Sequence, residues 1–169
     1  MQLQEPQDHA LGRSQGGFGT KLHLVCDSNG IVLAVWVTPG QRHESRAFAI
    51  VMLRAKRPRL PGRRRWPQQL AADKGYSYPG IRQWLTRHQI GGVIPTRKNQ
   101  VREESFDKAA YRRRSRIEQV IGWYKECRAL ATRYEKLAVN YIALWMVAII
   151  EKLLKRHSKV LKPILSERA

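Results

Sequence analysis

Cysteine and long apolar runs are both scarce in this 169-residue chain. Cys26 and Cys127 are far apart and lack the paired spacing of a metal-binding motif, so they predict neither a zinc site nor a disulfide scaffold and fit a reducing cytoplasm. The longest apolar run, 141–150, is too short to cross a bilayer. The polar first residues contain no apolar segment of the kind that signal peptides have.

Acidic residues are also few. Lysine and arginine total 32 against 13 aspartates and glutamates, which gives a formal net charge of +19. Such an excess on a domain of this length indicates a polyanionic partner. Nucleic acid is the first candidate, an anionic membrane surface is the weaker alternative, and a membrane-spanning protein is not expected.

The first half of the chain predicts a hairpin followed by a helix. Residues 1–15 show no periodicity and are expected to form an irregular lead-in. Segments 20–26 and 31–38 have the alternation and β-branched content of two strands, with a turn between them. Asp27 begins that turn, and its side chain is interpreted as structural. Residues 44–53 carry apolar side chains at helical spacing.

A basic segment follows, with seven lysines and arginines and no acid between residues 54 and 65. Prolines and a glycine interrupt it, which predicts an exposed loop. The loop is either a disordered, solubilising insert or a DNA contact. DNA contact is favoured, because like charges repel one another unless an anion joins them. The candidate contacts are Arg63, Arg64 and Arg65.

Asp73 follows a short apolar stretch, 68–72, that reads as a buried strand. A helix is predicted from Pro79 to residue 88 and a second strand over 90–95, an order typical of a parallel crossover. In open α/β sheets ligands bind at the carboxyl ends of the strands. Asp73 is therefore predicted to lie at the edge of the sheet where an active site is expected.

The most basic helix is predicted after Ser105, which is expected to cap it, and no proline interrupts the run to residue 133. At 3.6 residues per turn, four of its side chains fall within an arc of roughly 60°. These four are Tyr111, Arg114, Glu118 and Lys125. Taken alone, a glutamate among arginines is usually a solvated ion pair.

The spacing of those four residues resembles the Tyr-Arg-Glu-Lys signature of the DDE transposases of bacterial insertion sequences. Further stretches similar to that family lie in the same order at 12–27, 38–44, 72–76 and 131–137. The resemblance covers nearly the whole chain. It implies an α/β, ribonuclease H-like mixed sheet with flanking helices.

By this resemblance, Asp73 is the second and Glu118 the third of three catalytic, metal-binding carboxylates. Two Mg²⁺ or Mn²⁺ ions would clamp the attacking and leaving oxygens during cleavage of the element ends and strand transfer into target DNA. Arg114 and Lys125 would hold phosphates, and Tyr111 would stack or hydrogen-bond at the cleaved end. The structural alternatives are that Tyr111 faces the core and that Arg114 merely neutralises Glu118.

The sequence departs from the family at the first aspartate, which belongs on a strand upstream of Gly12. Glu5 and Asp8 are the acids ahead of that position, and neither lies in a strand pattern. We therefore expect the first strand to be missing, as in a fragment or a downstream reading frame. The product of an upstream reading frame is the expected partner.

Segment 135–156 predicts a packing helix, with a homodimer contact as a further expectation. The expected organisation is a partial catalytic core over 16–157 and a tail over 158–169, in a cytoplasmic, nucleoid-associated protein. Two other functions remain open: a DNA-binding protein without chemistry, and a ribonuclease H-like nuclease that cuts without joining.

Overall fold

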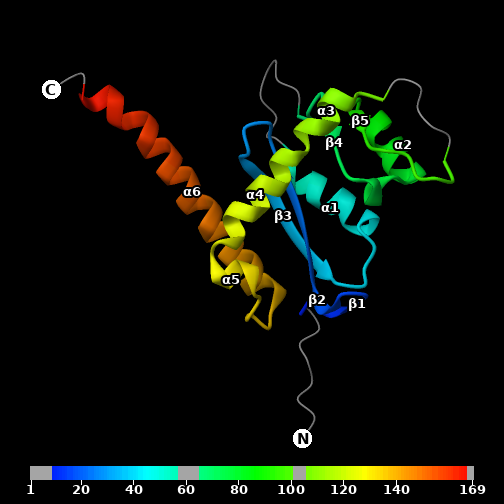
Figure 1. Cartoon of the computed structure of the whole chain (residues 1–169), viewed down its shortest axis with the longest axis horizontal. Helices are drawn as coiled ribbons and strands as arrows, with labels where there is room; N and C mark the ends of the chain where they lie inside the picture. The colour runs from blue at the N-terminus through cyan, green and yellow to red at the C-terminus, as the bar shows by residue number, and fades with distance from the viewer. Residues whose placement is uncertain (1–8, 57–64, 101–105, 167–169) are drawn as a thin grey trace, which may run out of the picture. The chain divides into compact units, whose positions relative to one another are not determined.

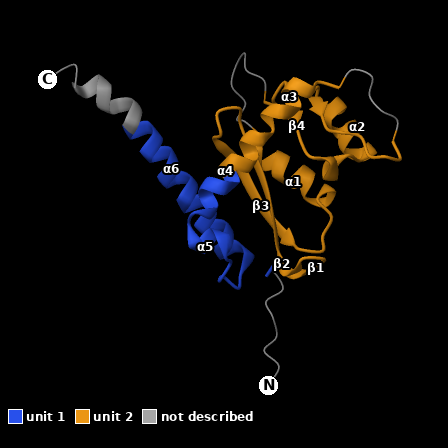
Figure 2. Ribbon diagram, viewed as in Figure 1, with its two compact units in different colours: residues 1–10, 121–169 blue, residues 11–120 orange. Residues whose placement is uncertain are grey.

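The computed structural model describes residues 9–56, 65–100 and 106–166, and it is a mixed α/β structure (Figure 1). It divides into two compact units (Figure 2). One unit is Leu11–Val120, and the other combines Met1–Ala10 with Ile121–Ala169. The predicted residues Asp73 and Glu118 both belong to the first unit.

An antiparallel sheet in the order β1-β2-β3 opens the first unit. Its strands are β1 (Gly12–Ser14), β2 (Gly17–Cys26) and β3 (Val32–Pro39). The predicted hairpin is confirmed, whereas β1 lies within the segment expected to be irregular. Asp27 Oδ1 accepts hydrogen bonds from the backbone N–H groups of Asn29, at 2.9 Å, and Ile31, at 2.8 Å. These bonds confirm the turn-forming role of Asp27.

Helix α1 (Ser45–Ala55) packs on the β2–β3 hairpin, as Figure 1 shows. Its Phe48 and Met52 are also part of a buried cluster with side chains that follow later in the chain. The other members are Ile81, Leu85, Ile90 and Ile94. This cluster joins the hairpin half of the unit to the half that carries Asp73, and burial of apolar surface is its main stabilising term.

The second half of this unit contains the predicted parallel crossover. Strand β4 (Gln69–Ala71) pairs in parallel with β5 (Gly91–Val93), and α2 (Pro79–Arg87) connects them. The expected single mixed sheet is not formed by the described strands, which make two separate sheets. The physical reason is that β4 pairs only with β5 within the described ranges, so no ladder links it to the hairpin.

Two consecutive helices replace the single long helix that was predicted. Helix α3 (Lys108–Arg113) is followed by its C-cap residue Arg114, and α4 (Ser115–Lys125) begins at the next residue. Asp107, not Ser105, caps α3, since its Oδ1 accepts from the Ala110 N–H at 2.8 Å, and Ser105 itself lies outside the described residues. The helical run ends at residue 125 rather than 133 because Cys127 is extended.

The other unit is helical and contains α5 (Arg128–Ala131) and α6 (Ala138–Ser166). Tyr141 Oη donates a hydrogen bond of 2.7 Å to the Leu130 carbonyl, and Trp145 is fully buried. The predicted packing helix is thus present and extends further than expected. Among the described residues, no helix is both long and apolar enough to span a bilayer.

Candidate active site

Asp73 lies two residues beyond β4, at the carboxyl end of that strand, as predicted. It caps the short 3-10 helix η1 (Lys74–Tyr76), and its Oδ1 accepts a 2.8 Å hydrogen bond from the Gly75 N–H. The side chain is exposed, and Oδ2 has no hydrogen-bond partner in the described part of the chain. One carboxylate oxygen is thus fixed by the backbone and the other is available.

Glu44 approaches the same turn from the start of α1. A side chain built on Gly75 would meet Asp73 Oδ1 at 2.9 Å and Glu44 Oε2 at 3.7 Å, so the two carboxylates flank this glycine. Glu44 also forms a 2.8 Å ion pair with Lys21. Partial burial acts to raise the pKa of Glu44, but the hydrogen bond and charge of Lys21 outweigh it, and the pKa is lowered.

A hydrogen-bonded network of side chains from β2, β3 and η1 holds this turn in place. The Nδ1 atom of His23, on β2, lies 3.0 Å from Tyr76 Oη, and Nε2 lies 2.8 Å from Thr38 Oγ1. Burial lowers the pKa of His23. Burial and the negative charges of Asp73 and Glu44 raise the pKa of Tyr76. We therefore expect a neutral imidazole and a neutral phenol at neutral pH. Sequence reasoning missed this network, because His23 reads only as one position of an alternating strand.

The structure brings Tyr111, Arg114 and Glu118 together. Arg114 Nη2 lies 2.6 Å from Glu118 Oε1, and the Arg114 guanidinium carbon lies 5.4 Å from the centre of the Tyr111 ring. Burial lowers the pKa of Arg114, but the Glu118 carboxylate outweighs it, and the pKa is raised. The Glu118 side chain nevertheless remains 61% exposed.

Lys125, the fourth residue of the signature, is exposed at the end of α4 and makes no ion pair with a described residue. Asp73 and Glu118 are not joined by a hydrogen bond or ion pair. The two regions are linked through the side chains of Gln69 on β4 and Asp107 at the start of α3, which lie 3.4 Å apart. Within the described ranges, no group of three or more His, Cys, Asp or Glu side chains is arranged to hold a metal ion.

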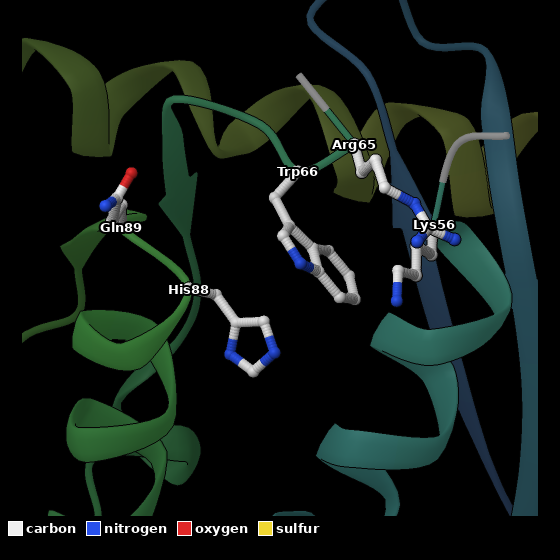
Figure 3. A pocket seen from close by; sticks show the side chains of 5 residues that line it. All are labelled: Lys56, Arg65, Trp66, His88 and Gln89. Carbon is white, nitrogen blue, oxygen red and sulfur yellow. The ribbon is translucent and has the colours of Figure 1, made fainter. Parts of the chain in front are cut away.

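Of the three candidate DNA contacts in the basic loop, Arg63 and Arg64 lie outside the described residues. Arg65 is exposed and lines a hollow of about 400 Å³. Figure 3 shows the five lining side chains, which are Lys56, Arg65, Trp66, His88 and Gln89. Sequence reasoning missed the hollow. The available signal was a tryptophan directly after the arginine run, with a second tryptophan and a histidine four residues apart on α2.

A comparison with family models shows which family the chain belongs to. A model of the family described as Transposase DDE domain matches residues 3–150, which is most of the chain. The chain belongs to the DDE transposase domain family. Comparisons with curated proteins and with solved structures gave no match. The resemblance predicted from the sequence is thereby confirmed at the level of the DDE transposase family.

Membership of the DDE transposases implies DNA binding, DNA cleavage and strand transfer with divalent metal ions. The donor atoms of this chain are of the type that such ions prefer. Asp73 and Glu118 supply hard carboxylate oxygens, and each is exposed with one oxygen bonded and the other without a partner among the described residues. This pair supplies two of the three carboxylates that the family resemblance implies.

Proposed function

We propose that this chain is the DNA transposase of an insertion sequence, acting on the element ends and on target DNA at the bacterial nucleoid. The observation that supports this most directly is the pair of exposed carboxylates in one compact unit of a DDE transposase family chain. Asp73 lies two residues beyond a parallel strand, and Glu118 lies on a helix that begins directly after three arginines. The position of Asp73 near the end of a parallel strand supports the proposal of a ribonuclease H-like arrangement, in which a strand end carries part of the chemistry.

In this proposal Asp73 and Glu118 hold Mg²⁺ or Mn²⁺, which when bound would stabilise charge on the attacking and leaving oxygens of a phosphodiester. The Gly75 N–H orients the Asp73 carboxylate, and the His23–Tyr76 hydrogen bond fixes the turn that carries it. Arg114 positions Glu118. Lys125 binds DNA phosphate, and Tyr111, held against Arg114, contacts the cleaved end.

A third carboxylate would come from the product of an upstream reading frame. The support for this is the division of the described strands into two sheets within one unit, with β4 paired only to β5. An unpaired strand edge is a template for another strand. A strand that carries an aspartate and pairs at this edge would bring that aspartate beside the end of β4.

A DNA-binding protein without chemistry is the second candidate. The net charge of +19 is sufficient for tight, salt-dependent DNA binding, and two carboxylates hold two ions poorly. The two candidates differ in what the carboxylates do. In the second, neutralising Asp73 or Glu118 leaves both metal binding and DNA affinity unchanged in the presence of Mg²⁺.

The test uses the full chain, Mn²⁺ and matched variants. Paramagnetic broadening of the Gly75 amide signal by Mn²⁺ reports metal binding at Asp73 without requiring activity. We expect the broadening to be lost in Asp73→Asn and weakened in Glu118→Gln. Glu151→Gln is the control, because Glu151 forms an exposed ion pair four residues from Lys155 on a helix, as Glu118 does with Arg114.

Strand transfer is then compared between the chain alone and a fusion extended by the upstream reading frame. We expect joined products from the fusion and none from its Asp73→Asn variant. Cut but unjoined DNA would indicate a nuclease instead. Equal activity of the chain and the fusion would refute the proposal that an upstream strand completes the site.

A further inference from the structure

The hollow in Figure 3 is built around aromatic side chains. The rings of Trp84 on α2 and His88, which caps the end of α2, stack with centroids 3.9 Å apart and an interplanar angle of 24°. The half-buried indole of Trp66 lies edge-on to both, with centroids at 5.1 Å from Trp84 and 4.9 Å from His88. His88 Nδ1 donates to the Trp84 carbonyl at 2.8 Å, which fixes its ring. The result is a rigid aromatic wall.

Two cations that make no ion pair with a described residue border this wall. Lys56 Nζ lies 5.1 Å from the centre of the Trp66 ring, and Arg65 immediately precedes Trp66. None of the ion pairs in the described part of the chain involves Lys56 or Arg65, and no acidic side chain lines the hollow. In Figure 3 the Trp66 indole projects between His88 and these two cationic side chains. A ligand with a flat ring and a negative charge would complement this arrangement.

Gln89 adds an unusual feature at the rim. It follows the end of α2 with φ of +54°, a left-handed conformation that a glycine would adopt with less strain. A glutamine side chain at this position has a backbone cost, and it presents an amide that can both donate and accept hydrogen bonds. That combination suits the polar edge of a nucleobase.

We propose that this hollow binds one unpaired nucleotide of single-stranded DNA. The base stacks on Trp66, Gln89 contacts its polar edge, and Lys56 and Arg65 neutralise the adjacent phosphates. In duplex DNA each base face is covered by its neighbours, so only an unpaired base can enter such a site. A hollow of about 400 Å³ lies within the range of small-ligand sites. The inference takes DNA as the partner, as the family implies, but does not depend on Asp73, Glu118 or a metal ion.

The experiment measures binding of the full chain, in EDTA, to a short single strand and to a blunt duplex of the same sequence. For Trp66→Ala we expect roughly ten- to hundredfold weaker binding of the single strand and little change for the duplex. Trp66→Phe should retain most of the affinity. Trp123→Ala is the control, because Trp123 is an exposed tryptophan whose ring, like that of Trp66, lies near a lysine Nζ, that of Lys152 at 4.7 Å. It should leave the preference for single strands unchanged.

Gln89→Gly separates function from folding. Glycine relieves the left-handed backbone, so this variant should unfold at an equal or higher temperature and still bind single strands several-fold more weakly. A single strand carrying 5-iodouracil should crosslink to Trp66. Equal losses for single strand and duplex, wild-type affinity of Gln89→Gly, crosslinking elsewhere, or equally tight binding of a mononucleotide would each overturn the proposal. Metal binding by Asp73 is measured separately, so either proposal can fail alone.

Discussion

His23 Nδ1 and Tyr76 Oη lie 3.0 Å apart, which ties the centre of β2 to the turn that follows Asp73. The two residues are 53 positions apart in sequence. Because His23 also contacts Thr38 on β3, the position of the Asp73 turn depends on the hairpin sheet. Substitutions in the network of His23, Tyr76 and Thr38 should therefore change both the stability and the chemistry of the site.

The first prediction concerns pH. Burial lowers the pKa of His23 below its ordinary value of 6.5, while nearby Glu44 raises it and Lys21 lowers it. As pH falls, the unfolded chain therefore takes up a proton before the folded chain does. The stabilisation is complete above about pH 6.5 and is lost as pH falls through the folded pKa. Chemical denaturation at several pH values between about 8 and 5 should show this decrease.

His23→Gln should flatten that decrease, because the titrating group is gone. His43→Gln is the control: His43 is an exposed histidine that contacts Tyr78 at 2.6 Å. In His43→Gln the decrease should persist, because His23 is still present. A His23→Gln profile as steep as that of the wild type would show that another group controls the acid response.

The second prediction concerns the hydroxyl of Tyr76. Tyr76→Phe leaves a nitrogen of a buried imidazole without its partner, which costs about 1–3 kcal/mol. Tyr78→Phe removes a hydroxyl that also contacts a histidine, His43, but at an exposed position. We expect a clearly smaller loss for Tyr78→Phe. Equilibrium unfolding of the two variants checks the difference, and equal losses would contradict a special role for the buried bond.

The third prediction uses Gly75. A methyl group there would meet Asp73 Oδ1 at 2.9 Å, and that oxygen can move aside only by giving up its 2.8 Å hydrogen bond from the Gly75 N–H. Gly75→Ala should therefore displace the carboxylate, weaken Mn²⁺ binding and lower the free energy of unfolding by about 1 kcal/mol, the usual net worth of one hydrogen bond. Gly80→Ala is the control, since a methyl group at that position meets nothing within 4 Å. Wild-type Mn²⁺ affinity in Gly75→Ala would remove Asp73 from the proposed metal site.

The fourth prediction concerns DNA phosphate contacts. Lys125 makes no ion pair with a described residue, whereas Arg114 is paired with Glu118 at 2.6 Å. If Lys125 contacts a phosphate, Lys125→Ala should reduce the slope of log affinity against log salt by about one. Lys155→Ala removes a lysine that is already paired with Glu151 and should change the slope less. Fluorescence anisotropy with duplex DNA over a range of NaCl concentrations measures both slopes, and equal slopes for the two variants would argue against a Lys125 contact.

The local residue pattern was sufficient to predict much of the fold. Alternation predicted β2 and β3, helical spacing predicted α1 and α2, and the order of elements predicted the parallel pairing of β4 and β5. The strands and helices themselves depend on residues within a few positions of one another, and the β4–β5 pairing follows from the strand, helix, strand order. The spacing of Tyr111, Arg114 and Glu118 likewise predicted their contact, because Arg114 keeps a right-handed helical backbone between α3 and α4.

Contacts between distant segments were decided only by the tertiary structure. The His23–Tyr76 bond, the approach of Glu44 to Gly75, and the hollow that joins Lys56 and Trp66 to His88 each bring together residues from different elements. The separation of the strands into two sheets is of the same kind, since it depends on which edges find partners. Periodicity fixes which face of an element is apolar, and chain folding determines what that face and its polar neighbours meet.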